Sequence, residues 1–249
     1  MERNEYFYLK ILFRAVLLAV AHQSSPASAC DAASFPVVID IGHSPSQPGA
    51  ISATGRPEFE FNRDLATTIE KQLLVGGYPV TVLQSESGGL ISRAARANAI
   101  HPRLFLSIHH DSVQPQYLQF WTANGRIERY SDRFQGWSLF VSRDNVQFDR
   151  SLSFATALAN ALRTRGLPFS RHHAEPISHE NKTLLDPDRG IYAYDGLVIL
   201  RRVRAPAALI EAGVIVNRDE ERRAATPERR ALIAESVAQA VLQFCDFPP

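Results

Sequence analysis

The chain has 249 residues, of which 45% are hydrophobic and 21% charged, a composition typical of soluble globular proteins. This length predicts one domain, or at most two small ones. The formal net charge is +1, so the chain has no global basic field of the kind that attracts nucleic acid. We therefore expect no nucleic-acid partner.

The first 29 residues differ from the rest of the chain. A polar start is followed by an apolar stretch that contains Arg14, and then by small residues ending at Ala29. This order is typical of a secretory signal with an Ala-x-Ala cleavage site, and the stretch is too short for a comfortable membrane span. We predict a signal peptide over 1–29 and an exported domain, periplasmic or extracellular, over 30–249, with no stable membrane span after cleavage. A membrane anchor or a disordered N-terminus is the alternative.

The two cysteines, Cys30 and Cys245, lie at opposite ends of the expected mature domain. In an oxidising compartment such a pair can form a disulfide. Because Cys30 directly follows the expected cleavage site, lipidation of this residue is the alternative. Lipoprotein signals usually have Leu where Ala27 stands, so we favour the disulfide.

Apolar runs of strand length alternate with segments of helical spacing over 30–249. In chain order they are the strand 35–41, helix 62–75, strand 78–83, helix 91–100, strands 104–108 and 136–142, helix 151–165, the apolar runs 197–200 and 207–210, and helix 227–244. The first run is apolar, as a strand buried on both faces should be. We expect one α/β domain, a three-layer sandwich whose mostly parallel, twisted sheet is covered by helices on both faces.

Two segments, 113–135 and 170–194, are longer than connections need to be. Long loops in a compact domain are usually functional rims or lids, so either can border a substrate groove. The second contains His172, His173 and His179. Because histidines scattered over a solvated loop need no metal to explain them, we do not expect a second metal site there.

Two candidate functional residues follow the first predicted strand. His43 comes just after the strand end, where ligands bind in open α/β sheets, and Gly42 lets the backbone turn sharply. Glu58 lies just before the helix expected to begin near Asn62, with Glu60 as a nearby competitor. The alternative for His43 is a loop histidine without a role. The alternative for Glu58 is a residue that only stabilises the helix through its dipole.

Two more candidates lie at the ends of later apolar runs. Adjacent side chains on a strand point to opposite faces, so only one of His109 and His110 can face a given site, and His109 is the better candidate. Glu211 ends the run 207–210. Burial of this carboxylate would raise its pKa, which suits a general base near neutral pH. A pair of hydrogen-bonded structural histidines and a salt-bridged structural glutamate are the alternatives.

Two histidines and one glutamate are a standard catalytic zinc set that leaves the fourth position for water. A second carboxylate, not bound to the metal, can then take and return a proton. The chain supplies each part of this set.

Four strings carry a resemblance to a known family. They are VVIDIGHSPSQPGA, GRPEFEFNRDLA, LFLSIHHDS and PAALIEAGVIVNRDEE, in this order. Together they resemble the signature blocks of the zinc-dependent N-acetylmuramoyl-L-alanine amidases, over essentially the whole mature chain. The resemblance implies one Zn²⁺ per chain bound by His43, Glu58 and His109, with Glu211 as the catalytic residue. Glu58 has the family's spacing from the following Phe-Asn, and Glu60 does not.

The sequence departs from the family pattern at a few positions. A Ser-Pro pair replaces the second Gly pair of the first block, and His110 stands at the usual Ala position. Val214 and Val216 replace the usual Phe and Ser, whereas Gly213 and Asn217 agree with the pattern. These departures affect packing more than chemistry.

The resemblance implies hydrolysis of the amide bond between N-acetylmuramic acid and L-alanine of the peptidoglycan stem peptide. Glu211 would deprotonate the attacking water and return the proton to the leaving amine. We find no separate wall-binding domain, so targeting would depend on the groove or on an activator or regulatory protein, and we expect a monomer. A zinc peptidase acting on another peptide and a non-catalytic wall-binding module are the rival functions. Stem-peptide preference, constitutive or triggered activity, and a role in daughter-cell separation or wall recycling stay open.

Overall fold

The computed structural model describes residues 30–84, 89–178 and 180–246. The predicted signal peptide over 1–29 and His179 lie outside the described residues. The strands are β1 Val37–Ile41, β2 Val80–Leu83, β3 Leu104–Asp111, β4 Gln119–Ala123, β5 Arg126–Tyr130, β6 Ser138–Val141, β7 Thr183–Asp186, β8 Ile191–Ala193 and β9 Ala207–Val214. The helices are α1 Glu58–Val75, α2 Leu90–Ile100, α3 Phe148–Thr164, α4 Val198–Arg202, α5 Arg218–Ala224 and α6 Pro227–Asp246.

A mixed, mostly parallel sheet of seven strands forms the middle of the molecule, in the order β2-β1-β3-β9-β6-β8-β7. β1 is parallel to β2 and β3, and β3 is parallel to β9. β6 and β8 are parallel to one another, whereas β6 is antiparallel to β9 and β7 is antiparallel to β8. The carboxyl ends of β1, β3 and β9 therefore meet at one edge, where residues that follow these strands come together.

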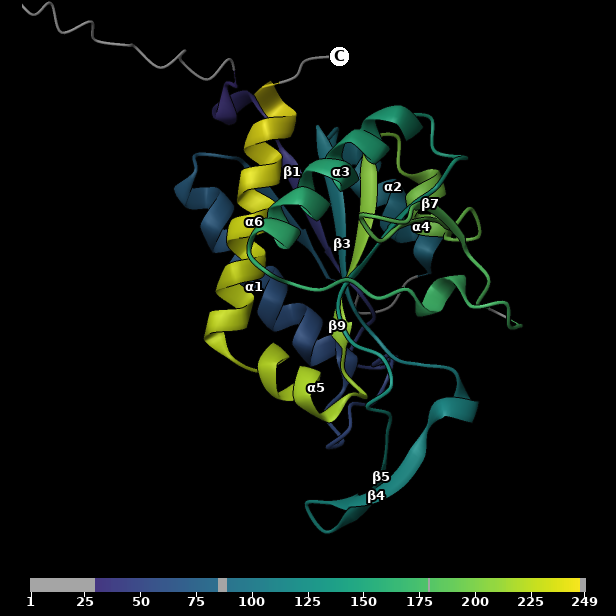
Figure 1. Ribbon diagram of the computed structural model, residues 1–249. Coiled ribbons are helices and arrows are strands. Elements are labelled where there is room, and N and C mark those ends of the chain that lie inside the picture. The colour runs from purple at the N-terminus through teal and green to yellow at the C-terminus, as the bar shows by residue number, and fades with distance from the viewer. Residues whose placement is uncertain (1–29, 85–88, 179, 247–249) are drawn as a thin grey trace, which may run out of the picture.

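Helices cover both faces of the sheet, as Figure 1 shows. Alternate residues of β1 face opposite sides, because side chains alternate along a strand. Val37, Ile39 and Ile41 pack in the cluster that contains residues of α1, α3 and α6. Val38 and Phe105 pack in the second cluster, with residues of α2 and α4. The predicted three-layer α/β fold is confirmed.

Several elements differ from the sequence-based expectation, including the following. α1 begins at Glu58, so this residue lies in the first helical turn, and β3 continues through both histidines to Asp111. The apolar run 197–200 contributes to the short helix α4, where Ile199 and Leu200 are buried. Apolar runs this short do not distinguish a strand from a buried helical turn by periodicity.

The long segment 113–135 contains a hairpin that the sequence analysis did not assign. Asn124 and Gly125 join β4 to β5, and both have positive φ angles, 50° and 74°. Asn-Gly in a two-residue loop is the preferred pair for such a turn, and it is the sequence signal that could have located the hairpin. The hairpin projects beyond the edge at which β1, β3 and β9 end (Figure 1).

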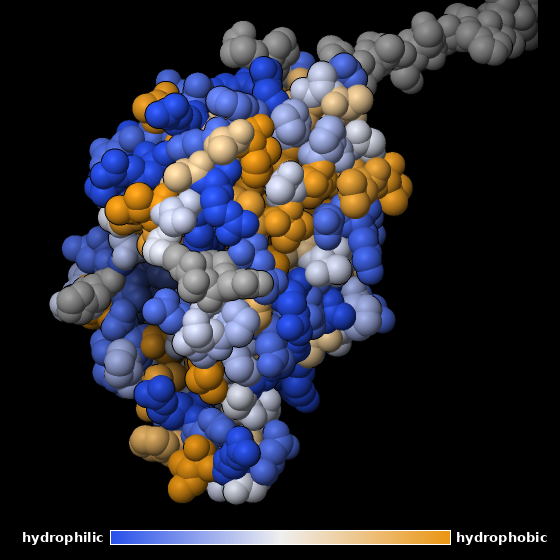
Figure 2. Space-filling model, turned by 180° about the vertical axis from the view of Figure 1, so that it is seen from behind, coloured by the Kyte–Doolittle hydropathy of each residue, from blue (hydrophilic) through white to orange (hydrophobic). Residues whose placement is uncertain are grey.

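In residues 30–84, 89–178 and 180–246 no helix combines the length and the hydropathy needed to cross a bilayer. The face shown in Figure 2 is mostly hydrophilic, with hydrophobic residues in several patches between polar ones.

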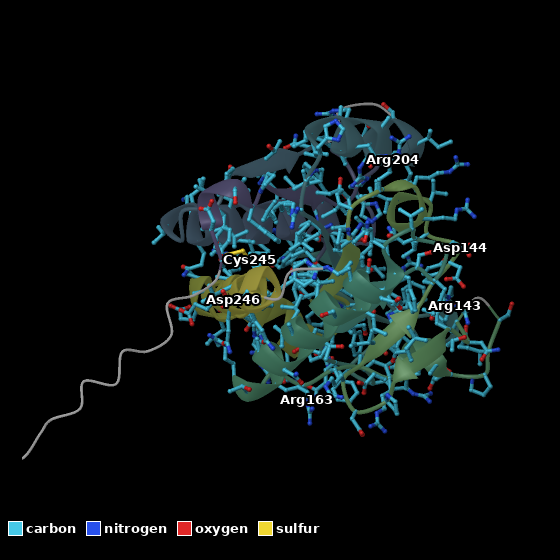
Figure 3. All side chains as sticks on the ribbon, turned by 90° about the horizontal axis from the view of Figure 1, so that it is seen from above. Arg143, Asp144, Arg163, Arg204, Cys245 and Asp246 are labelled. Carbon is cyan, nitrogen blue, oxygen red and sulfur yellow. A yellow bond between two sulfur atoms is a disulfide. The ribbon has the colours of Figure 1, made fainter. Side chains whose placement is uncertain are left out.

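Cys30 and Cys245 form a disulfide, with their Cα atoms 5.1 Å apart. This confirms the pairing favoured from the sequence over lipidation of Cys30. The bond joins the start of the described chain to the end of α6 (Figure 3). It closes a loop with a sequence separation of 215 residues.

Removal of this disulfide should destabilise the domain strongly. In the chain-entropy model a loop of this length stabilises the folded state by about 5 kcal/mol relative to the unfolded chain. We expect the C30S/C245S variant to unfold at a lower urea concentration in denaturation followed by circular dichroism, and with a larger m-value, because the unfolded chain without the cross-link exposes more surface. Equal midpoints for the variant and the oxidised wild type would contradict this expectation.

Candidate metal centre and active site

His43 lies two residues beyond the end of β1, in a backbone conformation with φ of 66°. The N–H of Gly42 donates to the carbonyl of Ile108 at 2.9 Å, which continues the pairing of β1 with β3 past the strand end. A Cβ atom on Gly42 would collide with the ring of His109. Glycine at this position therefore allows the two histidine-bearing segments to approach one another.

Glu58 joins the two histidines. One carboxylate oxygen lies 3.0 Å from His43 Nε2, and the other lies 3.0 Å from His109 Nδ1. The N–H of Ala50 and the side-chain amide of Asn62 also donate to this carboxylate, each at 3.0 Å. Glu58 is only 4% exposed. Its position is thus fixed by backbone and side-chain donors as well as by the histidines.

The electrostatics of this group follow from its burial. Burial alone would raise the pKa of Glu58, but the hydrogen bonds with His109 and His43 and their positive potential hold that pKa well below its usual range. The ligand-type atoms of His43, Glu58 and His109 all lie within 4.8 Å of one another. Two imidazole nitrogens and a carboxylate kept in its charged form are the donor set that zinc prefers. The residues present therefore fit a zinc ion.

His110 faces away from this group, as expected for the residue after His109 on a strand. Its Nδ1 lies 2.8 Å from Asn62 Oδ1, and its ring packs near Phe61. Burial is the main reason that the pKa of His110 is lowered to about 4. His110 is therefore neutral at physiological pH. It is a buried, hydrogen-bonded structural histidine, which was the alternative considered for the pair.

Glu211 lies on β9, directly opposite His109 in the parallel pairing of β3 with β9. Its Oε2 is shielded from solvent and has no hydrogen-bond partner among the described residues. Burial raises the pKa of Glu211 well above its ordinary value, and the negative charges of Asp111, Glu58 and Glu180 raise it further. A carboxyl group with a raised pKa is suited to exchange protons near neutral pH.

A cavity of about 730 Å³ brings the candidate residues together. His43, His109 and Glu211 all line it, and Glu58 lies behind the two histidines. Glu60 is excluded from this site, because its carboxylate accepts from Arg56 Nε at 3.1 Å at the surface. The structure therefore brings together the four residues predicted from sequence.

A buried ion pair beneath the cavity was missed by the sequence analysis. Arg93 of α2 donates from Nε to Asp40 at 3.0 Å, and from Nη2 both to Asp40 and to the carbonyl of Ile41, the latter at 2.9 Å. Ser107 Oγ donates to the same carboxylate at 2.7 Å. Asp40 within an apolar strand was the signal that could have indicated a buried partner, since a buried charge requires one.

The expectation of a solvated loop around the other histidines was wrong. His172 and His173 are 3% and 7% exposed. Both ring Nε2 atoms approach Asp111, which is two residues after His109 on β3. Burial would lower the pKa of His173, but the charges of Asp111 and Glu180 and the hydrogen bonds to them together outweigh burial and raise that pKa to about 9. Without a bound cation, this cluster is a buried ion-paired group.

A His-Glu-His group around the buried Glu58, with the Glu211 carboxyl group beside it at the carboxyl edge of an α/β sheet, is an arrangement suited to a hydrolase that uses a metal ion. The chain belongs to the N-acetylmuramoyl-L-alanine amidase family, whose model matches residues 37–243. Membership in this family makes it a peptidoglycan amidase, an enzyme of cell-wall degradation.

Individual amidases are similar to this chain in sequence and in fold. The N-acetylmuramoyl-L-alanine amidase AmiC of Neisseria meningitidis serogroup B is 25% identical over 218 residues, which are 84% of this chain and 52% of that protein. The amidase Ami1 of Mycobacterium smegmatis has a similar fold, with a TM-score of 0.67 and 20% identity over 86% of this chain and 98% of that one. The CwlD amidase of Clostridioides difficile, solved in complex with the GerS lipoprotein, has a TM-score of 0.63 and 16% identity over 84% of this chain and 98% of that one.

Proposed function

We propose that the chain is a zinc-dependent amidase that hydrolyses the bond between the lactyl group of N-acetylmuramic acid and L-alanine of the stem peptide. The single observation that carries this proposal is the Glu58 carboxylate placed between His43 and His109, 3.0 Å from a nitrogen of each. His43, Glu58 and His109 would hold the ion. When bound, zinc would supply the positive charge that acidifies a water and polarises a carbonyl.

Glu211 has the position of the general base. Its neighbour across the strand pair is His109, so the carboxylate would lie beside the bound ion without being one of its three protein ligands. Glu211 would accept the proton of the attacking water and return it to the amine of L-alanine as the C–N bond breaks. The raised pKa of Glu211 makes its carboxylate a stronger base, which favours the first half of this transfer, acceptance of the proton from water.

Arg93 supports the site and does not take part in the proposed proton transfer. It lines the cavity and is held by Asp40, three residues before His43. This ion pair fixes the end of β1, and Ser107 connects it to β3. The ligand-bearing strand ends are thereby held by buried hydrogen bonds to one another.

The reaction can be identified from its products. Purified protein incubated with sacculi should release intact stem peptides that begin with L-alanine, detected by mass spectrometry. EDTA should abolish release and added zinc should restore it, because three ligands hold a dissociable ion. Release of shorter peptides or free amino acids would instead indicate a peptidase, and binding of sacculi without fragments would indicate a non-catalytic module.

We also propose export of the enzyme, with residues 1–29 as a cleaved signal peptide. Two features support export: the signal-like order of the N-terminal sequence, and a disulfide, which persists in oxidising compartments. A mature N-terminus at Cys30, measured by mass spectrometry of protein from the cell envelope, is the expected result. The complex of the similar CwlD amidase with a lipoprotein supports the further proposal that a regulatory protein can bind this domain.

A further inference from the structure

A second group of ligand-type atoms lies outside the His43, Glu58 and His109 group. We propose that Asp111, His172 and His173 bind a second divalent metal ion, with chemistry suited to zinc. This second site is supported by the convergence of the three side chains, by the partner that holds each of them from behind, and by their burial. It does not depend on the function proposed for the first group.

The three side chains converge on a small volume. His172 Nε2 lies 3.1 Å and His173 Nε2 lies 2.8 Å from the same oxygen, Oδ2 of Asp111. All three ligand-type atoms lie within 4.8 Å of one another. Around a tetrahedral zinc ion with bonds of about 2.0–2.1 Å, ligand atoms lie roughly 3.3 Å apart. Small side-chain movements would therefore suffice to admit an ion between them.

Each side chain is held through its other polar atom. His172 Nδ1 lies 2.7 Å from Ser170 Oγ, and His173 Nδ1 lies 2.9 Å from Glu180 Oε2. The remaining oxygen of Asp111 accepts from the N–H of Ser112 at 2.8 Å. Metal-binding histidines typically donate their second ring N–H to an oxygen in this way, which fixes the tautomer and directs the free nitrogen at the ion.

The partner of His173 is itself anchored. Gln114 Nε2 donates to the other carboxylate oxygen of Glu180 at 2.8 Å. In many zinc proteins a carboxylate accepts a hydrogen bond from the histidine that binds the metal. A fixed carboxylate makes this histidine a stronger ligand. The chain supplies every part of this arrangement except the ion.

His172 gives an independent indication of a missing ligand. Its Nε2 is buried and, although close to Asp111, has no hydrogen-bond partner of acceptable geometry among the described residues. A buried polar nitrogen that has an ion-pair contact but no well-aligned hydrogen bond is incompletely stabilised. Phe134 packs against the His172 ring, and Phe140 packs against His173. This apolar surrounding would exclude water and strengthen the binding of an ion.

A bound ion would join residues 172–174 to β3. Asp111 belongs to β3, whereas His172 and His173 lie in a short 3-10 helix of the long segment. His173 and Glu180 also line the cavity that contains Glu211. The second ion would thus fix one wall of the substrate cavity.

Zinc counting in a variant that lacks the first group tests the proposal directly. The H43Q/H109Q variant leaves Asp111, His172 and His173 in place. After removal of metal by a chelator, titration with zinc followed by desalting and elemental mass spectrometry should give about one equivalent per chain, and about two for the wild type. Adding His172→Gln or His173→Gln to the variant should abolish the remaining equivalent.

His101→Asn is the matched control, because His101 is an exposed histidine with a φ of 52°, a conformation that asparagine tolerates. On the H43Q/H109Q background it should leave the remaining equivalent unchanged. Circular dichroism establishes whether each variant is folded. If a variant is not folded, the number of zinc equivalents bound by the wild type decides whether the second site exists: two equivalents support it, and one contradicts it.

The outcomes separate this proposal from the function proposed above. If zinc is absent from folded H43Q/H109Q, or remains after His172→Gln is added, the second site does not exist. One equivalent in the wild type that is lost with His172→Gln but kept in H43Q/H109Q would support the second site and remove the first. One equivalent in the wild type that is lost in H43Q/H109Q but kept with His172→Gln would overturn only the second site.

Discussion

Glu211→Gln should lower the rate of stem-peptide release from sacculi by on the order of 10²–10⁴-fold, the usual contribution of a positioned general base. Glutamine keeps the size of the side chain and loses its ability to accept a proton. Because Glu211 is not one of the three ligands of the first group, the variant should still bind zinc there. The measurement is the initial rate of fragment release, with zinc content determined on the same sample.

The same substitution should leave the metal-free protein at least as stable as the wild type. Burial raises the folded-state pKa of Glu211 above its unfolded value. The contribution of this group to stability is therefore fully present below the unfolded pKa and is lost as the pH rises through the folded pKa. Glutamine resembles the protonated form and does not titrate, so the stability advantage of the variant in EDTA should grow from pH 4 to pH 8.

Glu235→Gln is the matched control for both measurements, because Glu235 is exposed on α6 and makes a distant 3.7 Å pair with Arg165. It should change neither the release rate nor the pH dependence of unfolding. A folded, zinc-containing Glu211→Gln protein that releases peptide at the wild-type rate would remove Glu211 from the mechanism. A variant that loses zinc would show that Glu211 acts on the metal group instead.

The residues at strand ends could be predicted because a local signal identifies them. His43 follows an apolar strand, and His109 and Glu211 lie at the ends of apolar runs, so parallel pairing places them at one edge of the sheet. Glu58 could be distinguished from Glu60 by its resemblance to a family block. The alternation of strands and helices was likewise sufficient to predict the α/β fold.

Contacts between distant segments could not be predicted in the same way. The sequence shows His172 and His173 as part of a polar segment, and their burial depends on Asp111 and Phe134, which lie on other segments. The run 197–200 was ambiguous for a different reason. Packing against the second face of the sheet, rather than a period in the sequence, selects a helical turn there.

The pair of Asp40 and Arg93 is a further contact of this kind, because the partners are 53 positions apart in the sequence. Asp40 is 0% and Arg93 6% exposed. Removing one member of a buried pair costs about 3–5 kcal/mol, since the other charge is left without compensation. We expect Arg93→Met to lower the free energy of unfolding by this amount in urea denaturation, because Asp40 would retain only Ser107 as a side-chain donor.

Arg96→Met is the control on the same helix, where Arg96 is exposed and donates to the carbonyl of Gln84 at 3.3 Å. Its effect should stay within about 0.5 kcal/mol. The double variant D40N/R93M, which removes both charges, should be more stable than Arg93→Met alone. If the double variant is instead less stable by the sum of the single effects, the two side chains are not coupled.

The buried pair should also affect metal binding, because Asp40 lies three residues before His43 and shares Ser107 with β3. Loss of Arg93 releases its hydrogen bond to the carbonyl of Ile41, the last residue of β1. The turn that carries His43 would then be less well fixed, and outer partners of metal ligands typically change metal affinity by about 10–100-fold. We expect Arg93→Met to release zinc to a chelator at a lower chelator concentration than Arg96→Met does. Equal zinc retention in the two variants, measured where both are folded, would restrict the ion pair to a role in stability.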